Sequence, residues 1–153
     1  MKRIKIYLGG PIFSIGEKQF NLNLANSLEK KVPGISFILP QEYANKITKK
    51  RNFAKKMFTY CIESIDKADI ILCLLDGPDV DSGTALEIGY AFAQRKPIIG
   101  LRSDFRNSEI RGVNLMIIGA CTEFYWLPNH RKASKDYIQI IAGTIRRIAR
   151  GVK

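Results

Sequence analysis

The sequence predicts an α/β fold of the flavodoxin-like, or Rossmann-like, kind: a three-layer sandwich with a five-stranded parallel sheet between two layers of helices. Short apolar runs alternate along the chain with longer segments whose apolar residues recur at helical spacing, which is typical of α/β proteins. The run at 70–75 is apolar throughout, as expected of a central parallel strand covered on both faces. No linker or internal repeat interrupts the pattern, so we expect one domain over residues 1–153.

Two strands and a helix are expected in the first part of the chain. The strand at 4–8 ends at Gly9-Gly10-Pro11, because glycine and proline favour turns. The helix at 17–31 has apolar residues at helical spacing and stops at Pro33-Gly34. A second strand at 35–39 then closes at a proline.

The remaining elements continue the alternation. A helix at 52–68 carries apolar residues on one face, and the strand at 70–75 leads through a polar loop into a helix at 83–94. The last elements are, in order, a strand at 97–101, a helix at 113–120, a strand at 123–126 and a helix at 134–150.

The composition is typical of a soluble chain that folds alone. Of the 153 residues, 46% are hydrophobic and 25% charged, which argues against disorder and against a fibrous repeat. The longest apolar run is far too short to span a membrane and the first residues do not resemble a signal peptide, so we expect a cytoplasmic protein without a membrane partner. Cys61, Cys73 and Cys121 fit neither a disulfide framework nor a zinc site. We expect them to be small buried hydrophobic residues, and we expect no metal.

The net charge of +11 is unevenly distributed. Basic residues concentrate in 46–56 and 131–153, whereas carboxylates concentrate in 63–87. We interpret the basic segments mainly as solvated helix faces. An alternative from another class is a non-catalytic module that binds nucleotides or nucleic acid through 46–56. The segment lacks the alternating basic and aromatic residues of a stacking surface, so a nucleic-acid partner is not expected.

Ligands of such sheets bind at the carboxyl ends of the strands, and the loop after the third strand is unusual there. Asp76, Asp79, Asp81 and Glu87 fall within this loop and the start of the next helix. The three aspartates suit turns and helix N-caps. Glu87 shares a helical face with small residues that would let a ligand approach closely, although a salt-bridged surface glutamate is an equal alternative.

Several common nucleotide chemistries are not supported by the first loop. A receiver domain would need an acidic pair after the first strand, where this chain has Gly9-Gly10-Pro11-Ile12-Phe13. Neither a phosphate-binding P-loop nor a dinucleotide fingerprint is present there. We therefore expect no cofactor.

Four separated motifs, in order, are similar to those of the nucleoside 2-deoxyribosyltransferases, and the similarity extends from about residue 2 to residue 121. They are Ile6-Tyr7-Leu8-Gly9-Gly10-Pro11-Ile12-Phe13, Leu39-Pro40-Gln41-Glu42, the segment from Asp79 to Ala91, and Asn114-Leu115-Met116. The resemblance implies cleavage of the N-glycosidic bond of a 2′-deoxynucleoside and transfer of the sugar to another nucleobase.

The resemblance also implies roles for individual residues. Glu87 would be the nucleophile, Tyr7 would orient it, and Gln41 and Asp81 would contact the base. Because the leaving base needs a proton at a ring nitrogen, we consider Asp81 the candidate to donate or relay it. Asn114 and Met116 would approach the sugar from a neighbouring subunit, which implies a homo-oligomer with shared sites. Further substrate-binding residues would be Gly9, Pro11, Phe13, Asp79, Ser82 and Gly83.

One departure from the family pattern concerns the sugar. Where many members have an aspartate or asparagine, eight residues before the acid that opens the third strand, this chain has Cys61. Preference for 2′-deoxyribose over ribose is therefore left open. The alternative enzyme is a nucleoside 5′-monophosphate N-glycosidase that releases free base to water, but Pro11-Ile12-Phe13-Ser14 is a more apolar turn than a phosphate site requires.

Three further residues have alternatives. Arg102 and Arg106 follow the fourth strand, where they could belong to a lid or bind a phosphate, although ordinary surface positions are favoured. His130 stands alone beside Pro128-Asn129 and is expected to be an exposed loop residue.

Overall fold

The structure, a computed structural model, describes residues 3–47, 51–106, 112–128 and 136–151. Its strands are β1 (Ile4–Gly9), β2 (Ile35–Ile38), β3 (Ile70–Leu74), β4 (Ile98–Arg102) and β5 (Glu123–Trp126). Its helices are α1 (Ile15–Lys31), α2 (Pro40–Ile47), α3 (Phe53–Lys67), α4 (Ser82–Ala93), α5 (Leu115–Ala120) and α6 (Tyr137–Gly151). His130 and the predicted start of the last helix at residue 134 lie outside the described residues.

The five strands form one parallel sheet in the order β2-β1-β3-β4-β5, which confirms the predicted fold class. The chain leaves β1 for β2 on one side and then returns to β3 on the other side of β1. The strand order therefore reverses between β1 and β3, and a ligand is expected outside their carboxyl ends. The register places Gly9 of β1 beside Cys73 of β3 at that edge.

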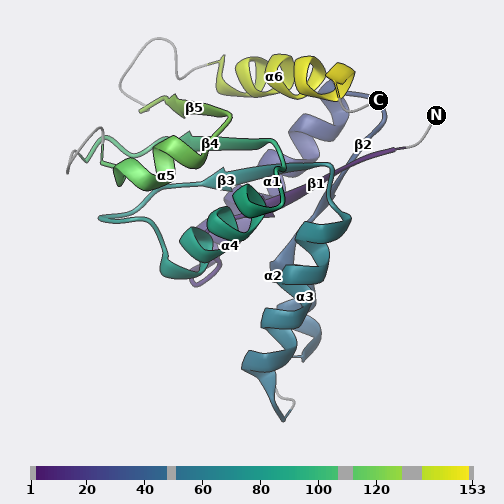
Figure 1. Ribbon diagram of the computed structural model, residues 1–153, viewed down its shortest axis with the longest axis vertical. Helices are drawn as coiled ribbons and strands as arrows, with labels where there is room; N and C mark the ends of the chain where they lie inside the picture. The colour runs from purple at the N-terminus through teal and green to yellow at the C-terminus, as the bar shows by residue number, and fades with distance from the viewer. Residues whose placement is uncertain (1–2, 48–50, 107–111, 129–135, 152–153) are drawn as a thin grey trace.

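The central strand β3 separates two cores. Its alternate side chains Ile70, Leu72 and Leu74 pack with α1 and α6, whereas Ile71 and Cys73 pack with α3 and α4. A parallel strand buried on both faces needs apolar residues at every position, and all five residues of β3 are buried. Figure 1 shows α4 and α5 in front of the sheet and α1 behind it.

Helix α2 is an unexpected element, since the sequence analysis placed no helix between the second strand, which closes at a proline, and the helix at 52–68. Pro40 occupies its first turn, where proline's fixed φ suits a helix and its missing N–H costs no hydrogen bond. Helices α2 and α3 run as a pair that extends below the sheet in Figure 1. We call this pair, residues 40–47 and 51–67, the α2–α3 arm.

Among the described residues, no helix is both long and apolar enough to cross a membrane.

Candidate active site

Glu87 and Tyr7 meet at the carboxyl end of β1, although 80 positions separate them in the sequence. The Tyr7 hydroxyl donates a hydrogen bond to Oε1 of Glu87, with an oxygen–oxygen distance of 2.6 Å. Tyr7 is fully buried in β1, and Glu87 is half-buried in the second turn of α4. A short bond from a buried phenol restricts the rotamer of the carboxylate, as the sequence comparison implied for Tyr7.

Gly9 makes room for this carboxylate. A Cβ atom at Gly9 would lie 2.8 Å from Oε2 of Glu87 and 3.2 Å from Sγ of Cys73. The first distance is too short for a carbon atom and the second is unusually tight, so a side chain at Gly9 would displace the carboxylate. The absence of a side chain is therefore a geometric requirement of this site.

Burial controls the ionisation of Glu87. It raises the pKa of the carboxyl group to about 7, because water is excluded from the charged form. Hydrogen bonds from Tyr7 and Cys61 act against this rise, and the negative charge of Asp81 adds to it. The N-terminus of a helix stabilises a nearby negative charge, but for Glu87 burial outweighs such stabilisation. Glu87 therefore exchanges a proton near neutral pH.

Cys61 contacts the pair rather than acting only as a core residue. Its thiol forms side-chain hydrogen bonds with Glu87 and Tyr7, and it packs with the core that contains Tyr7. Burial raises the pKa of this thiol to about 11, so the S–H proton is retained at neutral pH and can be donated. Cys73 is buried, as expected, whereas Cys61 and Cys121 are only partly buried, and Cys61 also interacts with ionisable side chains. Its helical spacing with Met57 and Ile65 was the sequence signal for an inward position.

Tyr7 also remains protonated. Burial, and next the charge of Glu87, raise the pKa of its hydroxyl far above the ordinary value. The phenol is therefore a permanent donor to the carboxylate at any physiological pH.

The start of α4 holds four of the predicted site residues. Asp81 is its N-cap and accepts hydrogen bonds through Oδ2 from the backbone N–H and the hydroxyl of Thr84, at 2.9 and 3.1 Å. Asp79 accepts from the N–H of Val80 at 2.8 Å, while Ser82 and Gly83 are exposed. The cap and turn roles considered for the two aspartates are thus present.

Asp76 and Arg102 join the loops that follow β3 and β4. Asp76 accepts from the N–H groups of Ser103 and Asp104, at 2.6 and 2.9 Å, and from the Ser103 hydroxyl. Arg102 is fully buried and donates to the carbonyl groups of Leu75 and Gly77. The expectation of a surface position, and the lid or phosphate alternative, were wrong for Arg102. It is a structural anchor between two loops.

Arg106 lies at the surface, as expected, and forms an ion pair with Asp104. Asp104 therefore neutralises the charge of Arg106, and Arg106 in turn holds the pKa of Asp104 well below the ordinary range.

The first loop and α2 supply three more predicted residues. Gln41 is buried, and its amide donates to the carbonyl of Lys18 at 2.9 Å and accepts from Asn21 at 3.1 Å. Asn21 also donates to the carbonyl of Pro11, at 3.2 Å. Phe13 is 76% exposed. Gln41 therefore links α2 to α1 and to the first loop, while Phe13 is available for contact with a ligand.

Asn114 and Met116 begin α5. Asn114 is the N-cap and accepts from the N–H of Met116 at 2.9 Å. Met116 is 81% exposed. No contact of either residue with Glu87 occurs within the described chain.

Comparisons with known proteins support a common family and fold. A family model described as "Nucleoside 2-deoxyribosyltransferase" matches residues 6–131. A conserved protein from Enterococcus faecalis V583 is 26% identical, with a TM-score of 0.76, 93% of this chain covered and 99% of that one. The search among curated proteins gave no match.

Two further solved structures share the fold. One is a 2-deoxyribosyltransferase from Bacillus psychrosaccharolyticus, 24% identical, with a TM-score of 0.65 and coverage of 85% of this chain and 94% of that one. The other is a CMP N-glycosidase from Clostridium botulinum, 20% identical, with a TM-score of 0.58 and coverage of 90% and 97%.

Among the described residues, no group of three histidine, cysteine, aspartate or glutamate side chains could hold a metal ion. The family model spans most of the sequence, including the segments that carry Tyr7, Gly9 and Glu87. The chain belongs to the nucleoside 2-deoxyribosyltransferase family.

Proposed function

We propose that this protein cleaves the N-glycosidic bond of a 2′-deoxynucleoside and transfers the deoxyribosyl group to an acceptor nucleobase. The observation that carries the proposal is the Glu87 carboxylate, oriented by Tyr7 at 2.6 Å and accommodated by the missing side chain of Gly9 at the carboxyl end of β1. Membership of the family supports it independently.

Glu87 acts as the nucleophile in the first half of the reaction. Its ionised Oε atom bonds to C1′ as the bond from C1′ to the base nitrogen breaks, through a transition state with positive charge on the sugar. The electron pair of the broken bond goes to the base, which takes up a proton. The product is a glycosyl ester of Glu87 and a free nucleobase.

Asp81 is the candidate donor of that proton. Its Oδ2 caps α4, whereas its Oδ1 makes no hydrogen bond within the part of the chain that the structure describes. A protonated carboxyl at this position could donate to a ring nitrogen of the leaving base. In the second half, a ring nitrogen of the acceptor base attacks C1′ from the face that the first base left and gives up its proton to Asp81. The bond from C1′ to Glu87 breaks, its electron pair returns to the carboxylate, and the new nucleoside has the original anomeric configuration.

The active site is proposed to be shared between subunits. Met116 and Leu115 form an exposed apolar pair at the start of α5, 81% and 58% exposed, and such a pair suits coverage by a second copy of the chain. Asn114 and Met116 of one subunit would then approach the sugar bound at Glu87 of another. Mixing inactive Glu87→Ala and Asn114→Ala subunits should restore activity after subunit exchange, and no restoration would contradict the shared site.

The decisive experiment is chromatography of reactions with 2′-deoxyinosine, with and without adenine, beside inosine and a 2′-deoxynucleoside 5′-monophosphate. Appearance of 2′-deoxyadenosine only when adenine is present would support transfer. Release of free base without an acceptor, above all from the monophosphate, would instead support an N-glycosidase. Comparison of inosine with 2′-deoxyinosine measures the effect of Cys61 on the choice of sugar.

A further inference from the structure

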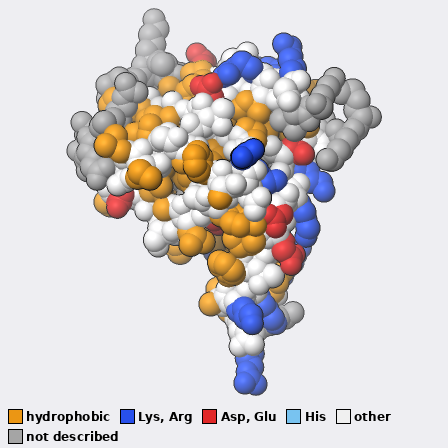
Figure 2. Space-filling model, viewed as in Figure 1, with side chains coloured by type: hydrophobic (Ala, Val, Ile, Leu, Met, Phe, Trp, Pro, Cys, Tyr) orange, Lys and Arg blue, Asp and Glu red, His pale blue; other side chains and the backbone are white. Residues whose placement is uncertain are grey.

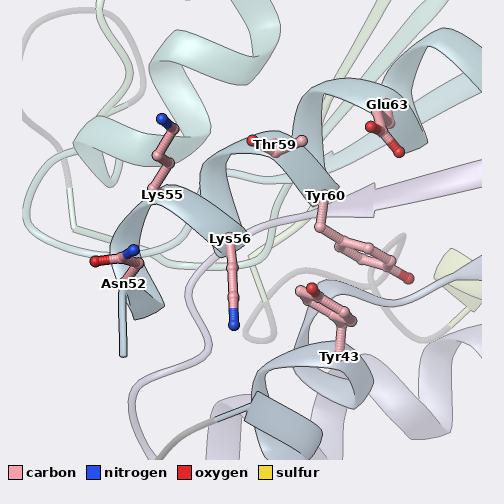
Figure 3. A pocket seen from close by; sticks show the side chains of 7 residues that line it. All are labelled: Tyr43, Asn52, Lys55, Lys56, Thr59, Tyr60 and Glu63. Carbon is pink, nitrogen blue, oxygen red and sulfur yellow. The ribbon is translucent and has the colours of Figure 1, made fainter. Parts of the chain in front are cut away.

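A hollow of about 570 Å³ lies on the α2–α3 arm, and its volume is typical of small-molecule sites. None of its lining residues contacts Glu87 or Tyr7 among the interactions described above. Figure 3 shows how the side chains from the two helices surround it. The lining residues are Tyr43, Asn52, Lys55, Lys56, Thr59, Tyr60 and Glu63.

Two stacked aromatic rings form one wall of the hollow. Tyr43 of α2 and Tyr60 of α3 lie with ring centroids 4.0 Å apart and an angle of 8° between their planes. Both side chains are half-buried and line the hollow. Each ring covers one face of the other, so a further planar ring, such as a nucleobase, can lie against an outer face or the shared edge of the pair.

The polar lining of the hollow is rich in hydrogen-bond donors. Within the described residues, the side chains of Lys56, Asn52 and Thr59 form no hydrogen bond or ion pair. Figure 3 shows Lys56 extending toward α2 beside the two rings. Among the described lining residues, Glu63 is the one carboxylate, and it is paired with Lys67 at 3.4 Å. The hollow therefore combines an uncompensated cation with an aromatic wall.

The exposed charged side chains Lys46 and Arg51 near the hollow are positive, like Lys56 in its lining. Lys46 and Arg51 are exposed on the arm, and Figure 2 shows Lys and Arg side chains gathered at its lower end. A local excess of positive charge attracts anions over distances of about 10 Å at moderate ionic strength. An anion that also carries a planar ring matches both features of the lining.

We propose that this hollow is a second binding site that takes a nucleoside monophosphate, with the base against Tyr43 and Tyr60 and the phosphate at Lys56. Asn52 and Thr59 supply an amide and a hydroxyl for the phosphate or the sugar. This site is independent of the chemistry at Glu87, so it does not require the proposed transfer reaction.

The test measures binding of 2′-deoxyadenosine 5′-monophosphate by isothermal titration calorimetry. The protein is the Glu87→Gln variant, which prevents turnover, and excess 2′-deoxyinosine is present to occupy the Glu87 site. Lys56→Gln should weaken binding by at least about fivefold, and Tyr60→Leu by a similar factor. Raising NaCl from about 50 to about 300 mM should weaken binding further.

Lys46→Gln is the matched control, because it removes the same charge from an exposed position on the arm outside the lining. It should change the affinity by less than about twofold. Equal affinity in Lys56→Gln and the parent protein would overturn the proposal, as would an equal loss in Lys46→Gln. Thermal unfolding of each variant confirms that the arm remains folded.

Two further probes distinguish a free nucleotide from inorganic phosphate and from a nucleic acid. Inorganic phosphate should bind much more weakly than the nucleotide, because it lacks the ring, and equal affinity would contradict the role of the tyrosines. A short single-stranded oligonucleotide that binds through Lys56 while the mononucleotide does not would overturn the assignment to a free nucleotide. A failure of the transfer reaction leaves all of these measurements interpretable.

Discussion

Glu87 and Asp76 belong to the same short acidic segment, yet the protein holds their carboxylates in opposite ways. Asp76 accepts hydrogen bonds from two backbone N–H groups and a serine hydroxyl of the loop after β4. Glu87 accepts from the side chains of Tyr7 and Cys61, and its pKa is raised to about 7 by burial. The carboxylate of Asp76, which is hydrogen-bonded to the backbone, stabilises the fold. The carboxylate of Glu87, which is held by side chains and shielded from water, can exchange protons and react.

The largest expected effect comes from exchanging each carboxylate for an amide. Glu87→Gln should lower kcat by roughly a thousandfold or more, because the amide cannot bond to C1′. Asp76→Asn should reduce kcat far less and instead lower the free energy of unfolding by about 1–2 kcal/mol. Steady-state kinetics and urea unfolding of both variants measure this contrast. A Glu87→Gln variant within tenfold of the parent activity would remove Glu87 as nucleophile.

Arg102, at the end of β4, and Arg106, in the loop that follows, allow a second comparison, between a buried arginine and an exposed one. Arg102→Ala should lower the free energy of unfolding by about 3 kcal/mol, since it leaves the buried carbonyl group of Leu75 and the partly buried one of Gly77 without this donor and opens a void. Arg106→Ala removes an ion pair whose arginine is exposed to solvent and should lower the free energy of unfolding by much less. Urea denaturation of the two variants is the measurement. Equal losses would contradict the anchoring role of Arg102.

The raised pKa of Glu87 predicts a pH dependence of stability. A carboxyl group whose pKa is higher in the folded than in the unfolded protein stabilises the fold when protonated, and this contribution is lost as the pH rises through about 7. Glu87→Gln should therefore be more stable than the parent protein at about pH 8, by about 2 kcal/mol, and nearly equal to it at about pH 4.5 or below. Denaturant unfolding at both pH values tests this, and a difference independent of pH would contradict it.

Tyr7→Phe should have the smallest effect, because it removes one hydrogen bond and keeps the ring. That bond lowers the pKa of Glu87, so its loss should raise the pKa further. If the reaction needs ionised Glu87, the acidic limb of the kcat/KM profile should move to higher pH by about one unit. An unshifted limb would show that Tyr7 does not tune the ionisation of Glu87.

The sheet was predictable from the sequence, because an apolar run such as 70–75 is typical of a parallel strand that is buried on both faces. The strand order then predicted the edge of the sheet at which a ligand would bind. The β1 loop and the start of α4 were likewise placed at the carboxyl edge by strand order alone. Helix α2 was not predictable in this way, because a proline after a strand favours a turn as readily as the first turn of a helix.

The environments of single side chains were harder to predict. Arg102 follows a strand as many surface arginines do, and only the two converging loops show that backbone carbonyl groups surround its guanidinium group. Cys61 meets Glu87 because of how α3 is rotated against α4, which helical spacing alone does not determine. Whether Asp81 and Gln41 contact a base stays a prediction, since both already have structural partners.

The separation of 80 positions between Tyr7 and Glu87 also concerns how the protein folds. Their hydrogen bond forms only after β1 and β3 have paired in parallel, and that pairing requires closure of the whole connection through α1, β2, α2 and α3. Contacts of such long sequence range are acquired late and slowly. We therefore expect recovery of turnover after dilution from denaturant to coincide with completion of the sheet.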